Sequence, residues 1–133
     1  MLAKQNPQAF LPDLARSLHN LGNRHSDLGR MGEALKVAKE AADIRRELAK
    51  QNPQAFLPDL AMSLGAYGSV LLSLDRHAEA SRAFAEGLQS LAPFYRKLPQ
   101  AFIGLARALL RDYVEACQKA GQEPDKDLLS QFD

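Results

Sequence analysis

The chain has 133 residues, of which 46% are hydrophobic and 25% charged, values close to those of an average soluble domain with one core. Its 17 basic and 16 acidic side chains are interspersed and leave a formal net charge of +1, which argues against a nucleic-acid-binding surface. The longest uncharged run, residues 60–74, is shorter than the roughly 20 residues of a membrane-spanning helix, so we expect neither a nucleic-acid nor a membrane partner.

An internal repeat organises the chain. Residues 2–15 recur without a change as residues 48–61, an offset of 46 residues, and the same offset carries residues 53–56 onto residues 99–102. A fixed period of this length is typical of solenoids, in which each unit stacks on its neighbours. We expect one domain over residues 1–133, with units at about 7–52 and 53–98, a partial capping unit at 99–121 and a short tail at 122–133.

The first unit predicts two helices. One covers about residues 11–28 and ends at a glycine cap, Gly29. Its apolar stripe follows helical spacing at Leu14, Leu18, Leu21, His25 and Leu28. The second helix covers about residues 34–51 with the same spacing of small and apolar residues, and we interpret its basic pair, Arg45 and Arg46, as solvated surface.

The second unit predicts helices at about residues 57–74 and 76–91, with Asp75 as the N-cap of the latter. The first of these helices has no ionisable side chain between Asp59 and Asp75. A helix that is small or apolar nearly all round must be covered nearly all round. We therefore expect residues 57–74 to form the middle of the stack, with Leu64, Tyr67 and Leu71 in the core, as Leu21 is in the first unit.

Prolines set the remaining boundaries. Proline inside a helix costs about 3 kcal/mol but is tolerated near a helix start, so we place Pro12 and Pro58 at the beginnings of their helices. Pro93 interrupts the pattern, and we expect the adjacent Phe94 and Tyr95 to pack under the next helix. That helix covers about residues 100–120, and the tail predicts one short helix within residues 124–132.

The small residues and turn glycines resemble the signature of the tetratricopeptide repeat family. The matching positions are Leu21, Gly22, Gly29, Ala34, Ala38 and Ala41 in the first unit, and Tyr67, Gly68, Ala80, Phe84 and Gly87 in the second. The period exceeds the usual 34 residues and is closer to the long-helix variety of kinesin light chains and bacterial multi-repeat proteins. The resemblance implies an all-α solenoid of about two and a half repeats, in which the first helix of each unit lines a concave groove for a peptide or partner protein.

The register of the family places a polar strip on the first helix, at Arg16, His19, Asn20, Asn23 and Asp27. The corresponding strip on residues 57–74 consists of Met62, Gly65, Ala66, Ser69 and Ser73, and that on the third unit includes Ala108, Arg111 and Asp112. The polar strip could hold an extended peptide or be an ordinary solvated face. The small strip could admit another backbone or let the helices pack closely. Our candidate groove residues are Arg16, His19, Asn20, Asn23, Asp27, Met62, Ser69 and Arg111.

No residue pattern indicates catalysis, a metal site or a cofactor. His25, Ser26 and Asp27 contain the letters of a hydrolase triad, yet neighbours on a helix point about 100° apart and cannot bond in sequence. Of the clamp with which some family members bind a C-terminal carboxylate, only Asn23 is present. The lone Cys117 fits a reducing compartment, and we expect a cytoplasmic protein.

The predicted function is therefore an adaptor or scaffold module that binds a protein or peptide, and it is not an enzyme. The alternative is a set of spacer repeats within a larger protein, which the unchanged duplication favours. Residues 2–6 copy the end of the second helix, residues 48–52, so we expect the first unit to lack the rest of a preceding neighbour. We expect Phe10, Leu11 and Leu14 to be partly uncovered and to mediate self-association as a homodimer, or contact within a longer array.

Overall fold

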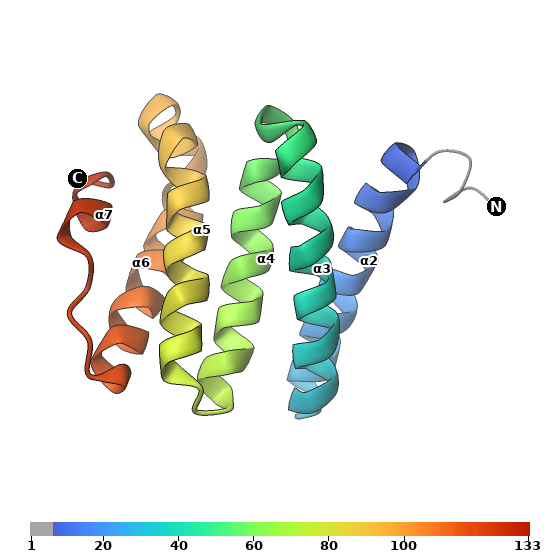
Figure 1. The fold of residues 1–133 in the computed structure, drawn as a ribbon, viewed down its shortest axis with the longest axis horizontal. Helices are drawn as coiled ribbons and strands as arrows, with labels where there is room; N and C mark the ends of the chain where they lie inside the picture. Colours follow the sequence, from blue (N-terminus) through green and yellow to red (C-terminus); the bar gives the residue numbers. More distant parts are fainter. Residues whose placement is uncertain (1–6) are drawn as a thin grey trace.

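The computed structural model describes residues 7–133, and this part of the chain contains helices and no strand (Figure 1). The described helices are α2 (Pro7–Asp27), α3 (Met31–Gln51), α4 (Pro53–Ser73), α5 (His77–Lys97), α6 (Pro99–Ala120) and α7 (Lys126–Ser130). Residues 1–6, of which 2–6 copy residues 48–52, lie outside the described part. The element order confirms the predicted all-α fold.

The helices follow one another along the molecule in sequence order, each packed against the next (Figure 1). In addition, α2 contacts α4 and α4 contacts α6, so the first helices of the three units form one layer. The second helices, α3 and α5, form the other layer. This arrangement is the predicted solenoid, with the layer of α2, α4 and α6 available to line a groove.

The turns inside the two units have the same geometry although their residues differ. Gly29 has φ of 76°, and Asp75, one period later, has φ of 59°. Both values lie in the left-handed region, which glycine adopts readily and aspartate tolerates better than most residues. The predicted capping role of Asp75 is therefore wrong: the N-cap of α5 is Arg76, which makes no side-chain capping hydrogen bond.

Two of the predicted helix starts are also wrong, because α2 begins at Pro7 and α4 at Pro53, with Pro12 and Pro58 inside them. Pro53 occupies the first turn of α4, where its missing N–H costs nothing. The side-chain oxygen of Asn52 accepts a hydrogen bond from the Ala55 N–H at 3.3 Å. This cap starts the helix five residues before Pro58.

Helix α5 likewise runs through Pro93 to Lys97 instead of ending near residue 91. The exposed proline is followed by two aromatic contacts that the helix gains by continuing. Phe94 meets Phe102 edge to face, with ring centroids 6.0 Å apart, and Tyr95 lies 5.2 Å from Phe132. The prediction that the pair packs under the next helix is confirmed for Phe94, which meets α6, whereas Tyr95 packs on Phe132 of the C-terminal tail.

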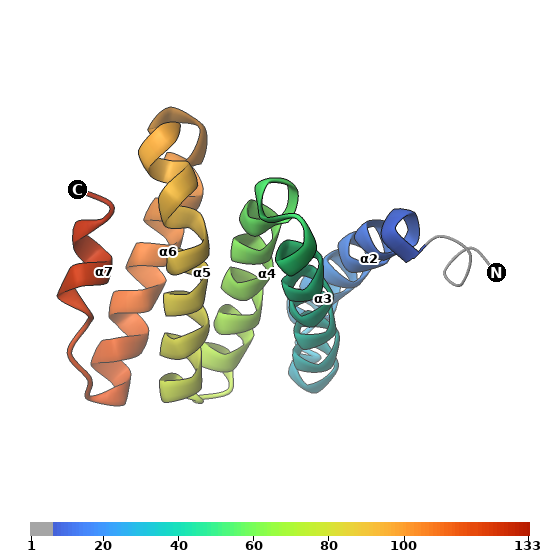
Figure 2. The same cartoon turned by 45° about the horizontal axis from the view of Figure 1, so that its top comes forward.

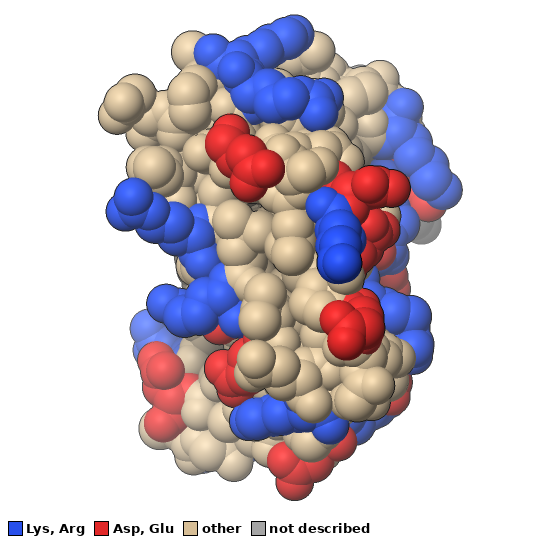
Figure 3. Space-filling model, turned by 90° about the vertical axis from the view of Figure 1, so that its left-hand side faces the viewer, with Lys and Arg blue, Asp and Glu red and all other residues tan. Residues whose placement is uncertain are grey.

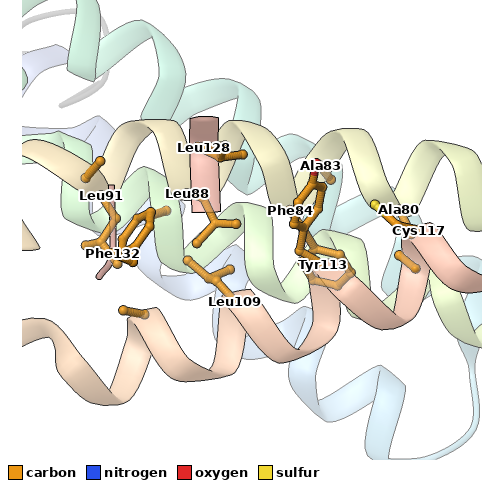
Figure 4. Packing of buried hydrophobic residues seen from close by; sticks show 14 of the residues in the cluster. Ala80, Ala83, Phe84, Leu88, Leu91, Leu109, Tyr113, Cys117, Leu128 and Phe132 are labelled. Atoms are coloured by element: carbon orange, nitrogen blue, oxygen red, sulfur yellow. The ribbon is translucent and has the colours of Figure 1, made fainter. Parts of the chain in front are cut away.

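The larger core cluster lies among α4, α5, α6 and α7 (Figure 4). Phe84 and Leu88 of α5 face Leu109 and Tyr113 of α6 across it (Figure 4). The predicted short helix α7 covers this end of the stack, with Leu128 and Phe132 buried. Figure 3 shows this end from outside, with basic and acidic side chains interspersed over its surface.

The first helix is less covered than predicted. Leu64 and Leu71 are buried as expected, and Tyr67 is partly buried, but Leu21 is 41% exposed and is not part of the core. Helix α2 buries Ala15 and Gly22 on the side that meets α3. Leu21 is instead exposed, because no helix lies beyond α2 in the described part of the chain (Figure 2), and Leu28 is exposed in the turn that follows α2.

The apolar composition of α4 agrees with its position between α3 and α5. By length and composition alone, its 21 residues could cross a membrane, with a mean hydropathy of 1.4 in the most apolar window. Its leucines Leu60, Leu64 and Leu71 are buried against the neighbouring helices. Coverage is less complete than predicted, since Met62 and Ser69 are exposed on the side that faces the groove.

Candidate functional site

A hollow of about 240 Å³ lies across α2, α4 and α6, and we call it the groove hollow. Helix α2 contributes His19 and Asn23, and α6 contributes Asp112 among other residues. The centre belongs to α4, where the lining residues are Met62, Gly65, Ala66 and Ser69. The structure thus brings together four candidate groove residues, namely His19, Asn23, Met62 and Ser69.

The centre of the groove hollow is lined by the small residues Gly65, Ala66 and Ser69. The absence of a side chain at Gly65 lets Leu109 of α6 approach, since a Cβ there would lie 3.1 Å from its methyl group. Close packing of α4 on α6 is therefore part of the role of the small strip. Ser69 remains exposed beside it, so the strip also leaves open surface.

His19 is the titratable group of α2 in this hollow. Burial lowers the pKa of His19 below 6.5, the nearby Arg45 guanidinium lowers it further, and Asp59 partly opposes both effects. The imidazole is therefore neutral at pH 7, with one nitrogen able to donate a hydrogen bond and the other able to accept one. At the other side of the hollow, the Asp112 carboxylate lies 3.2 Å from Nε of Arg111.

A second hollow of about 270 Å³ adjoins the first, and we call it the Arg45 hollow. It shares Met62 with the groove hollow and is lined by Arg16, Arg45 and Asp59, with apolar walls from Pro12, Leu48 and Phe56. Arg16 is exposed at its rim and lies 3.5 Å from Asp13. The candidate Arg16 therefore lines a different hollow from His19 and Asn23.

The interpretation of Arg45 and Arg46 as solvated surface is wrong. Arg45 is only 6% exposed, and its guanidinium donates to Oγ of Ser63 at 2.8 Å and to the Asp59 carbonyl at 3.3 Å. Burial lowers the pKa of Arg45, opposed by the Asp59 carboxylate. Arg46 binds Glu86 of α5 through two hydrogen bonds of 2.8 and 2.9 Å. Both arginines connect successive units.

The sequence contained a signal for Arg45, which lies one helical turn from Ala42 and Ala49 and so shares their buried stripe. Its charge led to the wrong assignment.

Three other candidates lie apart from both hollows. Asn20 and Asp27 are exposed on α2, and Arg111 is exposed on α6 beside Asp112. Phe10, Leu11 and Leu14 are partly buried, in agreement with the expectation that they are partly uncovered. Self-association through these three residues stays a prediction.

The profile of the tetratricopeptide repeat family matches residues 14–54, which cover most of α2 and all of α3. No curated protein and no solved structure matches the chain. Repeats of this family are in general non-catalytic modules that mediate protein–protein interaction or scaffolding. The long-helix variety stays a prediction. Residues 14–54 therefore match a tetratricopeptide repeat, and the described part of the chain, residues 7–133, is an all-α solenoid in which this repeat lies.

Proposed function

We propose that this chain is an adaptor or scaffold module that binds an extended segment of a partner protein across α2, α4 and α6. One observation carries the proposal: a floor of small residues on α4 lies between polar side chains of α2 and α6 in the groove hollow. A floor of this kind lets a peptide backbone approach closely, and the flanking polar groups can pair with it.

The chemistry of the flanking groups suits an uncharged peptide backbone. The Asn23 amide offers a donor and an acceptor, the same pair that each peptide unit presents. The neutral His19 and the Ser69 hydroxyl can also donate or accept. A segment that continues past Met62 enters the Arg45 hollow, where an acidic side chain would meet Arg16 and Arg45.

The test begins with peptides selected from a displayed random library on the wild-type protein. Their affinities are then measured for Ser69→Trp, which fills the groove hollow, and for the double variant Arg16→Ala/Asn23→Ala. We expect each change to weaken binding by about tenfold or more, the scale of a lost interface hot spot. Stability should change by less than about 0.5 kcal/mol in the double variant, since both side chains are exposed.

The matched control is Arg82→Ala/Gln89→Ala, which removes two exposed polar side chains from α5 in the other layer. Its affinity for the selected peptides should equal that of the wild type. If the selected peptides bind Ser69→Trp and Arg16→Ala/Asn23→Ala as tightly as they bind the wild type, the binding surface is not the one proposed.

The second candidate function is that of a spacer, and the observation that favours it is the unchanged recurrence of residues 2–15 as 48–61. Recently duplicated units have had little time to specialise. A library that yields no peptide sensitive to Ser69→Trp would support the spacer function over the adaptor function.

A further inference from the structure

The open side of α2 repeats, position by position, the surface by which α4 binds α3. On α4, that surface consists of Phe56, Leu57, Leu60, Ser63 and Leu64, which pack against Ala42 and Ala49 or bind Arg45. The same five residue types recur 46 positions earlier on α2, as Phe10, Leu11, Leu14, Ser17 and Leu18. Helices α2 and α4 therefore each carry a copy of the same docking surface.

The two copies of this surface differ in what covers them. On α4, Leu60 is 3% exposed and Leu64 is 1% exposed, because α3 lies over them. On α2, Leu14 and Leu18 are only partly buried, and Ser17 is exposed. Figure 2 shows α2 at the end of the stack, with α3 as its neighbour on one side only.

An ion pair in the other layer also has an unfilled equivalent one unit earlier. Arg46 of α3 binds Glu86 of α5 through two hydrogen bonds, of 2.8 and 2.9 Å, and so connects the second helices of successive units. The residue one period before Glu86 is Glu40 on α3. Glu40 is exposed and has no ion-pair partner among residues 7–133. An arginine at the position equivalent to Arg46, on a helix one unit before α3, would reach the Glu40 carboxylate.

From the repeated apolar surface on α2 and Glu40, unpaired among residues 7–133, we propose that the open face formed by α2 and Glu40 binds an amphipathic helix with the sequence pattern of α3. The bound helix would pack its small residues, the equivalents of Ala42 and Ala49, on Leu14 and Leu18. Its equivalent of Arg45 would donate to the Ser17 hydroxyl and to the Asp13 carbonyl, as Arg45 does to Ser63 and Asp59. Its equivalent of Arg46 would pair with Glu40.

This occupant is favoured over a second copy of the open face. In a two-fold dimer through α2, Leu14 would meet leucines of the partner, Ser17 would lack an arginine, and Glu40 would gain no partner from the α3 pattern. Only a helix of the α3 type satisfies the apolar positions, the hydroxyl and the carboxylate together. The surface is separate from the groove hollow, so the proposal does not depend on the groove binding a peptide.

The direct test titrates the full chain with a fluorescent synthetic peptide of residues 31–52 and follows its anisotropy. We expect saturable binding that Leu14→Glu weakens by about tenfold or more and Glu40→Arg by several-fold. The peptide variant Arg46→Glu should restore binding to Glu40→Arg, because the ion pair is then reversed. Glu123→Arg changes the net charge equally at an exposed site on the C-terminal side and should leave the affinity unchanged.

The same titration excludes another mode of binding. A peptide that displaced α3 from its own place would present its arginine to Glu86 and not to Glu40. Sensitivity to Glu40→Arg, with rescue by the reversed peptide, is therefore specific to the open face. Binding that is indifferent to both Leu14→Glu and Glu40→Arg would overturn the proposal.

The isolated peptide could be too poorly helical to bind, since short helices are marginal in water. A fusion of the α3 sequence to the start of the chain then tests the proposal instead. Residues 2–6 already equal residues 48–52, so a copy of residues 31–47 in place of Met1 recreates the whole α3 sequence before α2. We expect this fusion to melt several degrees above the original chain. The Glu40→Arg change should remove part of that gain, and a second Arg→Glu change in the added helix should restore it.

The outcomes against the proposal are also defined. No gain in melting temperature from the fusion, together with no peptide binding, would overturn it. Sedimentation that shows a dimer of the original chain, converted to monomer by Leu14→Glu, would assign the face to a second copy instead.

Discussion

Gly68 of α4 lies directly against the ring of Phe84 of α5, so that a Cβ on Gly68 would come within 2.6 Å of the ring. Both residues are buried, and Phe84 is completely covered. The glycine therefore allows the two helices of the second unit to approach with a phenyl ring between them. One period earlier, Gly22 faces the smaller residues Val37 and Ala38.

We expect Gly68→Ala to destabilise the protein, although alanine is the better helix former by about 1 kcal/mol. The added methyl group overlaps a ring that is completely buried, and overpacking of this kind costs about 1–3 kcal/mol. The control is Gly104→Ala in α6. A Cβ there would meet nothing within 4 Å, so this substitution should stabilise the chain. Urea denaturation midpoints that move in the same direction for both variants would contradict this explanation.

Leu64→Ala should lower the free energy of unfolding by about 2–5 kcal/mol, because a buried leucine loses its contacts and leaves a cavity. Leu64 is fully buried between α3 and α4, whereas Leu28 is largely exposed at the first turn. Leu28→Ala should therefore cost less than about 0.5 kcal/mol. Equal losses for the two variants in chemical denaturation would mean that the packing of α4 is wrongly described.

His19 should make the protein less stable in mild acid. Burial and Arg45 lower the pKa of His19 in the folded chain, so the unfolded chain binds more protons once the pH falls below about 6.5. The free energy of unfolding is then lost progressively from that pH down to the folded pKa. We expect His19→Gln to lose less stability than the wild type between pH 7.5 and 5.5 in urea titrations. A steeper loss in the variant would contradict the lowered pKa.

Cys117 should be nearly unreactive in the folded protein. The thiol is 2% exposed, and burial raises its pKa, although a hydrogen bond with Tyr113 partly opposes that shift. Thiol reagents attack the thiolate, so modification at pH 8 should be roughly a hundredfold slower in buffer than in concentrated urea. A chain with Cys117→Ala and Gln89→Cys, which presents an exposed thiol on α5, is the control and should react quickly in both. Fast modification of native Cys117 would show that α6 opens readily.

Much of the architecture could be predicted from the sequence because two units share their residues. The 46-residue offset predicted the number and order of the helices, and the glycine at position 121 predicted the end of α6, where φ is 69°. The strip positions His19, Asn23 and Ser69 followed from the family register, and the structure brings them into one hollow. Whether that hollow binds a peptide is outside what such a register can establish.

The errors arose where tertiary contacts outweighed a local rule. Pro93 is a helix breaker by propensity, yet the contacts of Phe94 and Tyr95 lie beyond it and favour continuation of α5. Arg45 is charged, yet Ser63 and the Asp59 carbonyl accept its hydrogen bonds in a buried position. Leu21 has the spacing of a core residue, but a core also requires a neighbour on that side, which periodicity in one helix does not reveal.

The central claim is that the layer of α2, α4 and α6 binds a partner segment, and chemical-shift mapping tests it most directly. Amide spectra of the labelled chain would be recorded during titration with a library-selected peptide. We expect the largest shifts at Asn23, Ala66, Ser69 and Asp112, which line the groove hollow. Shifts concentrated instead on the exposed residues of α3 and α5, such as Lys36 and Gln89, would contradict it.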